Sequence, residues 1–293
     1  MRVLTAVLLL IGSAVWAAEP IVVREHRFDK GGGIYTSTGA SWTMYSDSLS
    51  RTVRISQSKA TGQSGTKQGF AFYGHNPFGF KVLRLAVNGI DMEKLEYRHG
   101  KTREWRRESD GAHGFECDQN FDGVFLRVRF YLKPGSPLYF CEIERVPGRQ
   151  LSELKSCRVR LSGVASYAEP KRWWGYDRCL MTAVRTETLD KEDRKRVVEL
   201  SAHDRFLIWA DRTWDGSCDE KGERRGTGPS AIVPEWDGVL RANTELTHDS
   251  CQNFDFYLKP DFSYFRFAIY EENPSELTNS CIVDKLNSII KEE

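Results

Sequence analysis

The fold is decided by a stretch that reads Leu-Arg-Val-Arg-Phe at residues 126–130. The same alternation returns at residues 157–161, which read Cys-Arg-Val-Arg-Leu. Successive side chains of a β-strand point to opposite faces, so each stretch has one buried and one wet face. Residues 206–209 read Phe-Leu-Ile-Trp, a continuous apolar run that is typical of a strand buried on both sides. Both patterns predict strands.

Turn signals separate such stretches along the chain. They are pairs in which the first residue tolerates a positive φ and the second is glycine: Asn88-Gly89, Asp110-Gly111, Asp122-Gly123, Asp215-Gly216 and Asp237-Gly238. Helical segments do not alternate with the strands. The sequence therefore predicts an all-β fold, a large antiparallel β-sandwich with one C-terminal α-helix. It is either a double sandwich (a super-sandwich) or two tandem sandwiches.

The helix is expected near the C-terminus. Asn273 can cap it, Pro274 suits its first position and Glu276 completes a capping box. An apolar stripe follows at helical spacing, formed by Ile282, Leu286, Ile289 and Ile290. We expect this stripe to dock on a sheet and close an edge, with dimerisation as the alternative.

An internal repeat is suggested by two pairs of similar segments. Gln-Asn-Phe-Asp stands at 119–122 and 252–255, and Phe-Tyr-Leu-Lys-Pro at 130–134 and 256–260. An aromatic strand follows each pair, which predicts a hairpin in each copy with Lys-Pro ending its first strand. The repeat divides the mature chain into an N-terminal β half, 18–150, and a C-terminal β half with the terminal helix, 151–293. The alternatives are one continuous domain and a chance similarity.

Residues 1–17 are expected to be a signal peptide. Arg2 supplies the positive start, residues 3–15 form a short apolar run, and Val15-Trp16-Ala17 suits cleavage after Ala17. The run is shorter than a membrane span, and no later stretch reaches that length. An uncleaved anchor is the alternative. We expect a protein that is secreted or periplasmic.

The net charge of the chain limits the classes of partner that we expect. Lysine and arginine number 42 against 41 aspartates and glutamates, and removal of residues 1–17 takes away only Arg2. Nucleic acids and anionic membranes reward a clear positive excess, so neither is expected as a partner. The oligomeric state cannot be read from the sequence.

Seven cysteines in an exported chain suggest disulfides. Their odd number leaves at least one thiol unpaired, and the alternative is that they are buried thiols that pack like small apolar residues. They are Cys117, Cys141, Cys157, Cys179, Cys218, Cys251 and Cys281.

Two aromatic segments are the candidate ligand-binding sites. The first contains Trp173, Trp174 and Tyr176, and neighbouring side chains on a strand cannot all face the core. The second contains Trp214 and Asp215 in a long polar loop. An indole face packs against the C–H face of a pyranose, and a carboxylate accepts hydrogen bonds from sugar hydroxyls. The alternatives are core packing for the first segment, and a solvated loop or a calcium site for the second.

Asp118, Asn120 and Asp122, followed by Gly123, match the first half of a calcium-binding loop. The twelfth position is Arg129 instead of glutamate, so a structural hairpin turn is the favoured interpretation. Calcium is kept as the alternative, and no other cofactor is expected.

Three residues are candidates for acid–base chemistry. His75 and His113 lie in glycine-flanked, turn-like segments, and Asp211 follows the apolar run at 206–209. Glu142 and Glu144 share one strand face and would form a carboxylate pair if they faced a cleft.

Three functions fit these features. The first is a secreted carbohydrate-binding β-sandwich that recognises a glycan. The second is a sugar-active enzyme, a hydrolase, lyase or epimerase that uses histidine and carboxylates. The third is a non-catalytic surface or periplasmic interaction protein. The fold alone does not separate them.

Overall fold

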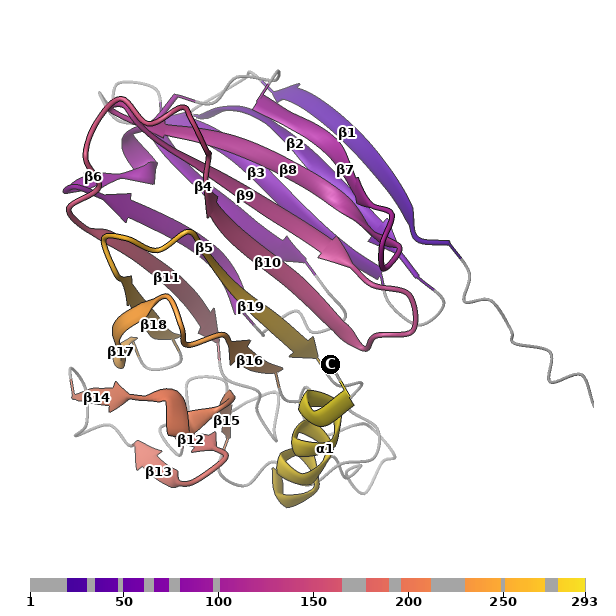
Figure 1. Ribbon diagram of the computed structural model, residues 1–293, viewed down its shortest axis with the longest axis vertical. Helices are drawn as coiled ribbons and strands as arrows, with labels where there is room; N and C mark the ends of the chain where they lie inside the picture. Colours follow the sequence, from indigo (N-terminus) through magenta and orange to yellow (C-terminus); the bar gives the residue numbers. More distant parts are fainter. Residues whose placement is uncertain are drawn as a thin grey trace, which may run out of the picture.

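The computed structural model describes residues 20–30, 35–46, 50–60, 66–73, 80–96, 101–164, 178–189, 196–211, 230–248, 251–271 and 279–292. These residues form two mostly antiparallel β-sheets that face each other, and one α-helix (Figure 1). The predicted all-β sandwich with a C-terminal helix is confirmed.

The ten-stranded sheet, sheet A, combines strands from early and late in the chain. Its order is β1 (Val22–Lys30), β2 (Tyr35–Tyr45), β3 (Ser50–Ala60), β4 (Thr66–Tyr73), β5 (Phe80–Val87), β11 (Cys157–Val164), β18 (Cys251–Leu258), β17 (Val239–His248) and β14 (Val197–Leu200), with β6 (Ile90–Asp91) also paired to β5. A short 3₁₀ turn, η1 (Met92–Lys94), follows β6.

The nine-stranded sheet, sheet B, combines the two parts of the chain in the same way. Its order is β13 (Thr186–Leu189), β12 (Arg178–Thr182), β15 (Leu207–Asp211), β16 (Ser230–Pro234), β19 (Tyr264–Glu271), β10 (Leu138–Arg145), β9 (Val124–Leu132), β8 (Ala112–Phe121) and β7 (Thr102–Arg107). A second 3₁₀ turn, η4 (Ala202–Asp204), precedes β15.

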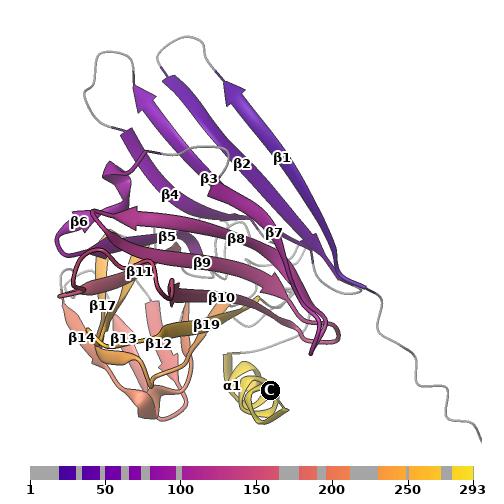
Figure 2. The same cartoon turned by 45° about the horizontal axis from the view of Figure 1, so that its top comes forward.

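The main core lies between the two sheets. Leu126, Val128 and Phe130 of β9 are fully buried in it, as their alternation with arginines predicts. The indole of Trp42 on β2 stacks on Phe115 of β8 with ring centroids 5.1 Å apart, so this contact joins the sheets directly. Figure 2 shows β7 to β10 lying across sheet A.

Strands from the two halves of the sequence pair directly in both sheets. In sheet A, β5 pairs with β11, and in sheet B, β10 pairs with β19. One continuous cluster of buried side chains reaches from Ile21 to Ile269.

The predicted hairpins of the internal repeat differ in the structure. The first copy is a hairpin, because β9 pairs with β10. The second prediction is wrong, because β18 belongs to sheet A and β19 to sheet B. The Lys-Pro turns are nevertheless alike: the Ser136 amide donates to the Lys133 carbonyl at 3.3 Å, and the Phe262 amide to the Lys259 carbonyl at 3.1 Å. The similar sequences therefore form a similar turn, but the strands before and after the turn pair differently.

Two of the predicted glycine turns are tight hairpins with positive φ at both central residues. Asn88 and Gly89 have φ of 50° and 80°, and Asp122 and Gly123 have φ of 51° and 90°. The first joins β5 to β6 and the second joins β8 to β9. Positive φ at consecutive positions explains the choice of asparagine or aspartate before glycine.

Helix α1 (Asn279–Glu292) docks on the outer face of sheet B. Ile282 and Leu286 are fully buried there, as the apolar stripe predicts, and Lys285 lies 5.5 Å from the Tyr270 ring. The expectation that the helix closes an edge is wrong, since the edge strands are β7 and β13. The predicted cap at Asn273 lies outside the described residues. None of the helices in the described ranges is long and apolar enough to cross a membrane.

Four of the seven cysteines are buried thiols that form no disulfide, so the disulfide prediction is wrong for them: Cys117, Cys141, Cys157 and Cys179. Topology explains this for the first two, because β9 lies between the strands β8 and β10 that carry them. Two strand spacings amount to about 10 Å, beyond the Cα separation that a disulfide can bridge. Burial raises the pKa of the Cys117 and Cys157 thiols to about 12.

Candidate functional site

An aromatic row crosses the outer face of sheet B and consists of Trp105, Tyr131 and Phe140. Their strands place the rings 5.1 Å and 5.2 Å apart, centroid to centroid, and the second pair stacks nearly parallel. Gly114 of β8 lies between Trp105 and Tyr131 in the register. A Cβ there would collide with the backbone of Phe130, so only glycine lets the row continue.

A charged row runs beside the aromatic row. Register places arginine and acid alternately on neighbouring strands, in the order Arg103, Glu116, Arg129, Glu142 and Arg266. Glu235, directly after β16, pairs with Arg266 and ends the row. Opposite charges that face each other across strands attract, so the pattern reinforces the strand order.

Arg129 is the centre of the charged row. Its guanidinium lies 2.9 Å from Glu116, 2.6 Å from Glu142 and 2.6 Å from Glu144, and its side chain is only 13% exposed. Burial opposes the charge, but the hydrogen bonds to Glu116 and Glu142 outweigh it and raise the pKa of Arg129. Glu142 and Glu144 are thus held by one arginine, which leaves them poorly suited to act as an acid and a base.

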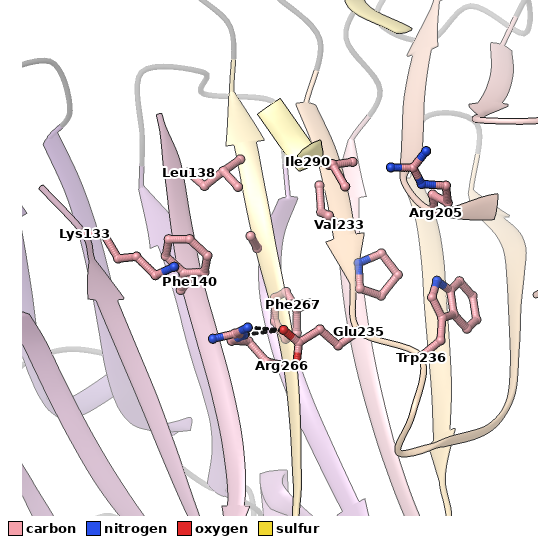
Figure 3. A pocket seen from close by; sticks show the side chains of 12 residues that line it. Lys133, Leu138, Phe140, Arg205, Val233, Glu235, Trp236, Arg266, Phe267 and Ile290 are labelled. Atoms are coloured by element: carbon pink, nitrogen blue, oxygen red, sulfur yellow. Dashed lines mark hydrogen bonds and ion pairs between the residues drawn. The ribbon is translucent and has the colours of Figure 1, made fainter. Parts of the chain in front are cut away.

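A groove of about 280 Å³ opens where the two rows approach helix α1; we call it the helix groove (Figure 3). Its lining residues are Lys133, Leu138, Phe140, Arg205, Val233, Pro234, Glu235, Trp236, Arg266, Phe267, Ala268 and Ile290. Most lining side chains are apolar and a few are polar, the usual make-up of a small-ligand site.

The polar groups of the helix groove come from separate elements. Arg266 of β19 donates from Nε to Glu235 Oε1 at 2.6 Å, and its Nη2 donates to the same oxygen. Lys133 places its ammonium 4.5 Å from the Phe140 ring centroid. The indole Nε1 of Trp236 is buried and has no hydrogen-bond partner in the described part of the chain, and the indole ring also packs edge-on against Phe256 of the main core, with ring centroids 6.0 Å apart.

A second hollow of about 280 Å³ adjoins the helix groove, and Glu235 lines both. Asp237 and Asp261 line it from two turns, and Tyr264 lies at its wall with half of its surface exposed, at 50%. Glu235 therefore lies between the two hollows.

Most residues predicted to form the site lie outside the described residues. These are His75, Trp173, Trp174, Tyr176, Trp214 and Asp215. Asp211 ends β15 opposite Arg178, and its side chain is also outside the described set. The described strand ends beside these segments pair with one another within each sheet: Phe80 pairs with Gly163 in sheet A, and Ser230 pairs with both Trp209 and Glu271 in sheet B.

His113 is described, and both of its ring nitrogens have protein partners. Nδ1 lies 2.6 Å from the carbonyl oxygen of Ile21, and Nε2 lies 2.7 Å from Glu104 Oε1 and 3.0 Å from Arg106 Nε. Hydrogen bonds from Arg106 and His113 hold the pKa of Glu104 below its usual value. In this position His113 ties the chain before β1 to β8.

The three candidate calcium ligands form part of the β8–β9 hairpin. Asp118 binds Arg127 at 2.7 Å, and Asn120 Oδ1 accepts from the Gly123 amide at 2.8 Å. Asp122 is a turn residue whose carbonyl accepts from Ser152 Oγ at 2.8 Å. The described residues contain no group of three or more His, Cys, Asp or Glu side chains that could hold a metal. The favoured hairpin interpretation agrees with these contacts.

The local sequence patterns did not predict the residues of the helix groove. Trp236 stands alone before the Asp237-Gly238 turn, and an isolated tryptophan gives little reason to suspect a site. The Glu235–Arg266 pair joins residues far apart in the chain, so only the register of β16 and β19 brings it together. An acid and a tryptophan directly before a turn were the available local signal.

No family model matches the chain, and no curated protein matches it. Among solved structures, the chain is similar to alpha-N-acetylgalactosaminidase NagBb from Bifidobacterium bifidum, with 9% identity, 90% of this chain and 38% of that chain covered, and a TM-score of 0.47. It is also similar to a TPR-domain containing protein from Parabacteroides distasonis, with 7% identity, 89% and 57% coverage and a TM-score of 0.47.

A third similar structure is the alpha-galactosidase from Lactobacillus brevis, with 9% identity, 86% and 40% coverage and a TM-score of 0.38. The chain thus spans between 38% and 57% of the length of these three proteins. At these identities and TM-scores the likeness carries no argument about function.

Proposed function

We propose that the protein is a secreted carbohydrate-binding β-sandwich and that a sugar binds in the helix groove. The observation that carries the proposal is the position of Trp236 beside the Arg266–Glu235 pair on the groove wall. An aromatic face contacts the C–H groups of a sugar ring, and charged side chains hydrogen-bond its hydroxyls. Secretion rests on the expected signal peptide at residues 1–17.

The second carboxylate oxygen of Glu235, Oε2, supports the binding of a sugar in the groove. Both hydrogen bonds from Arg266 go to Oε1 of Glu235, and no hydrogen bond to Oε2 is present among the described residues. The Glu235 side chain is 38% exposed, so Oε2 is available to a sugar hydroxyl. Arg266 fixes the carboxylate in advance, which lowers the ordering cost of binding.

The described acid–base groups favour sugar binding over catalysis, because they are already bound by other protein groups. Glu142 and Glu144 are bound by Arg129, and His113 is held between Ile21 and Glu104. The helix groove contains a single carboxylate, Glu235, whereas the sugar hydrolases that use an acid and a base need two.

The test is retention on a glycan array by the purified full-length chain and three variants. We expect Trp236→Ala and Glu235→Gln each to weaken retention about tenfold, since each removes one good contact. Tyr45→Ala is the matched control, because Tyr45 is an exposed aromatic on β2, outside the groove. Circular dichroism confirms that each variant folds. Absence of retention on any glycan, or full retention by both groove variants, would overturn the proposal.

A further inference from the structure

Two hollows meet at Glu235: the helix groove and the second hollow beside it, which we call the turn hollow. Each has a volume of about 280 Å³. Pockets that bind small organic ligands usually measure about 300–1,000 Å³, so each hollow alone is small, whereas the two together fall within that range. A ligand that fills both hollows is longer than one that fills the helix groove alone.

The turn hollow is framed by two turns that are hydrogen-bonded to each other. The turn at residues 259–262 is closed by the Phe262 amide, which donates to the Lys259 carbonyl at 3.1 Å. Lys259 also binds the turn that follows β16, because its amide donates to the Gly238 carbonyl at 2.9 Å and its ammonium to the Asp237 carbonyl at 2.6 Å. The shape of the turn hollow is thus set before a ligand arrives, which lowers the ordering cost of binding.

The turn hollow offers the same kinds of group as the helix groove. Tyr264 provides an aromatic ring, and half of the surface of this residue is exposed. Asp237 and Asp261 are exposed, and neither carboxylate has a hydrogen-bond or ion-pair partner within the described ranges. An aromatic ring beside a carboxylate is the combination for which Trp236 and Glu235 are assigned to sugar binding. The turn hollow therefore fits a second sugar unit.

Strand β19 sets the separation between the two hollows. Arg266 lines the helix groove and Tyr264 lines the turn hollow, two residues apart on this strand. Residues at this spacing point to the same face of the sheet and lie about 7 Å apart. The register agrees, because the two pair with Glu142 and Glu144, which share one face of β10. Neighbouring units of a glycan chain are offset by a comparable length, so one chain can occupy both hollows.

We propose that the ligand is a linear glycan chain of at least two sugar units, which passes over Glu235 from the helix groove into the turn hollow. This inference rests on the proposed function and names its ligand class. One unit contacts Trp236, the next stacks on Tyr264, and Glu235 accepts a hydroxyl hydrogen bond where the two units join. The two aspartates of the turn hollow accept hydrogen bonds from hydroxyls of the second unit. A single sugar would leave the turn hollow unfilled.

The test measures affinity against chain length by isothermal titration calorimetry. The probes are five length ladders, each from one to four sugar units: cello-, xylo-, manno-, chito- and malto-oligosaccharides. In one ladder we expect the two-unit member to bind about tenfold more tightly than the single sugar, because the second unit adds a stacking contact and hydrogen bonds.

Variants assign the gain from the second unit to the turn hollow. Tyr264→Ala should weaken binding of the two-unit member about tenfold, so that the ratio of affinities between two units and one falls to about one. Tyr264→Phe keeps the ring and should retain most of that ratio. Trp236→Ala should weaken binding of every member of the ladder and preserve the ratio.

Tyr45→Ala is the matched control, because Tyr45 is an exposed tyrosine on β2, outside both hollows. It should bind the whole ladder like the wild type. Circular dichroism confirms that each variant folds.

The outcomes separate this inference from the proposed function. Equal affinity for one unit and for the longer members, or a length preference that Tyr264→Ala leaves intact, overturns the inference and leaves sugar binding in the helix groove in place. Absence of binding to every ladder, together with retention of another glycan on the array, also overturns the inference alone. Absence of binding to every ladder and of retention on the array overturns both.

Discussion

Arg51 of β3 and Glu271 of β19 form an ion pair through the interior of the sandwich, with Nε 3.3 Å from Oε2. Their side chains are only 3% and 5% exposed, so the pair joins sheet A to sheet B away from water. Arg51 also donates from Nη1 to the Ser50 carbonyl at 2.9 Å. A buried ion pair of this kind contributes little net stability. The loss of one partner is nevertheless costly, because the other side chain then keeps a buried charge without that partner.

Arg51→Met is therefore expected to lower the free energy of unfolding by about 3–5 kcal/mol, because Glu271 would keep a buried charge that Arg51 no longer compensates. Urea denaturation measures this. The double variant with Glu271→Gln should recover much of the loss, since no charge is then left alone. A single variant within about 1 kcal/mol of the wild type would contradict the prediction.

Gly114→Ala is expected to destabilise the protein by about 1–3 kcal/mol, because its Cβ would collide with the backbone of β9. Gly69→Ala is the control, since the nearest atom to its Cβ would lie 3.6 Å away, at ordinary contact distance. Thermal denaturation of both variants is the measurement. Equal melting temperatures for the two variants would show that β8 can shift to accept a side chain.

The stability contributed by Asp110 should depend on pH. Hydrogen bonds from Arg107, at 2.7 Å and 2.9 Å, hold the pKa of Asp110 below its usual value. A lowered folded-state pKa gives stability that is full above the unfolded-state value of about 4 and is lost as pH falls through the folded value. Asp110→Asn should thus cost roughly 0.5–1 kcal/mol at pH 7, because the pair is partly exposed. In urea titrations the difference from the wild type should shrink toward zero in strong acid, and a constant difference would refute this origin.

The buried thiols should be unreactive in the folded protein. With a pKa of about 12, Cys117 and Cys157 hold almost no thiolate at pH 8, and both are sealed in the core. Alkylation with iodoacetamide, followed by peptide mass spectrometry, should label them only after denaturant is added. Labelling of either thiol in the native protein at the rate of free cysteine would show that the core opens readily.

The alternation at residues 126–130 correctly predicted which side chains face the core. It did not predict the surroundings of Arg129, which is nearly buried although it lies on the expected wet face. Its three carboxylate partners come from β8 and β10, and their arrival depends on register, which a local pattern does not contain.

Because a local pattern does not contain the strand pairing, it also failed to predict the second copy of the repeat and the helix groove. Residues 252–258 resemble the first copy locally, but β18 pairs with β11 and β17 instead of β19. Trp236 is isolated in the sequence, unlike Trp173 and Trp174, and the residues that line the groove with it, Arg266 and Lys133, are distant from it along the chain. Local composition identifies aromatic segments, whereas a groove depends on which strands become neighbours.

Because β5 pairs with β11 and β10 with β19, the chain can be expressed as two fragments that depend on each other. A break at Leu151, whose residue surface is 82% exposed, falls in the link between β10 and β11. Each separate fragment would carry two long edge strands whose backbone N–H and C=O groups are unpaired. Such edges pair with strands of other molecules and cause aggregation. Produced together, the fragments carry matching edges and are suited to reassemble as a split protein; produced apart, each would precipitate.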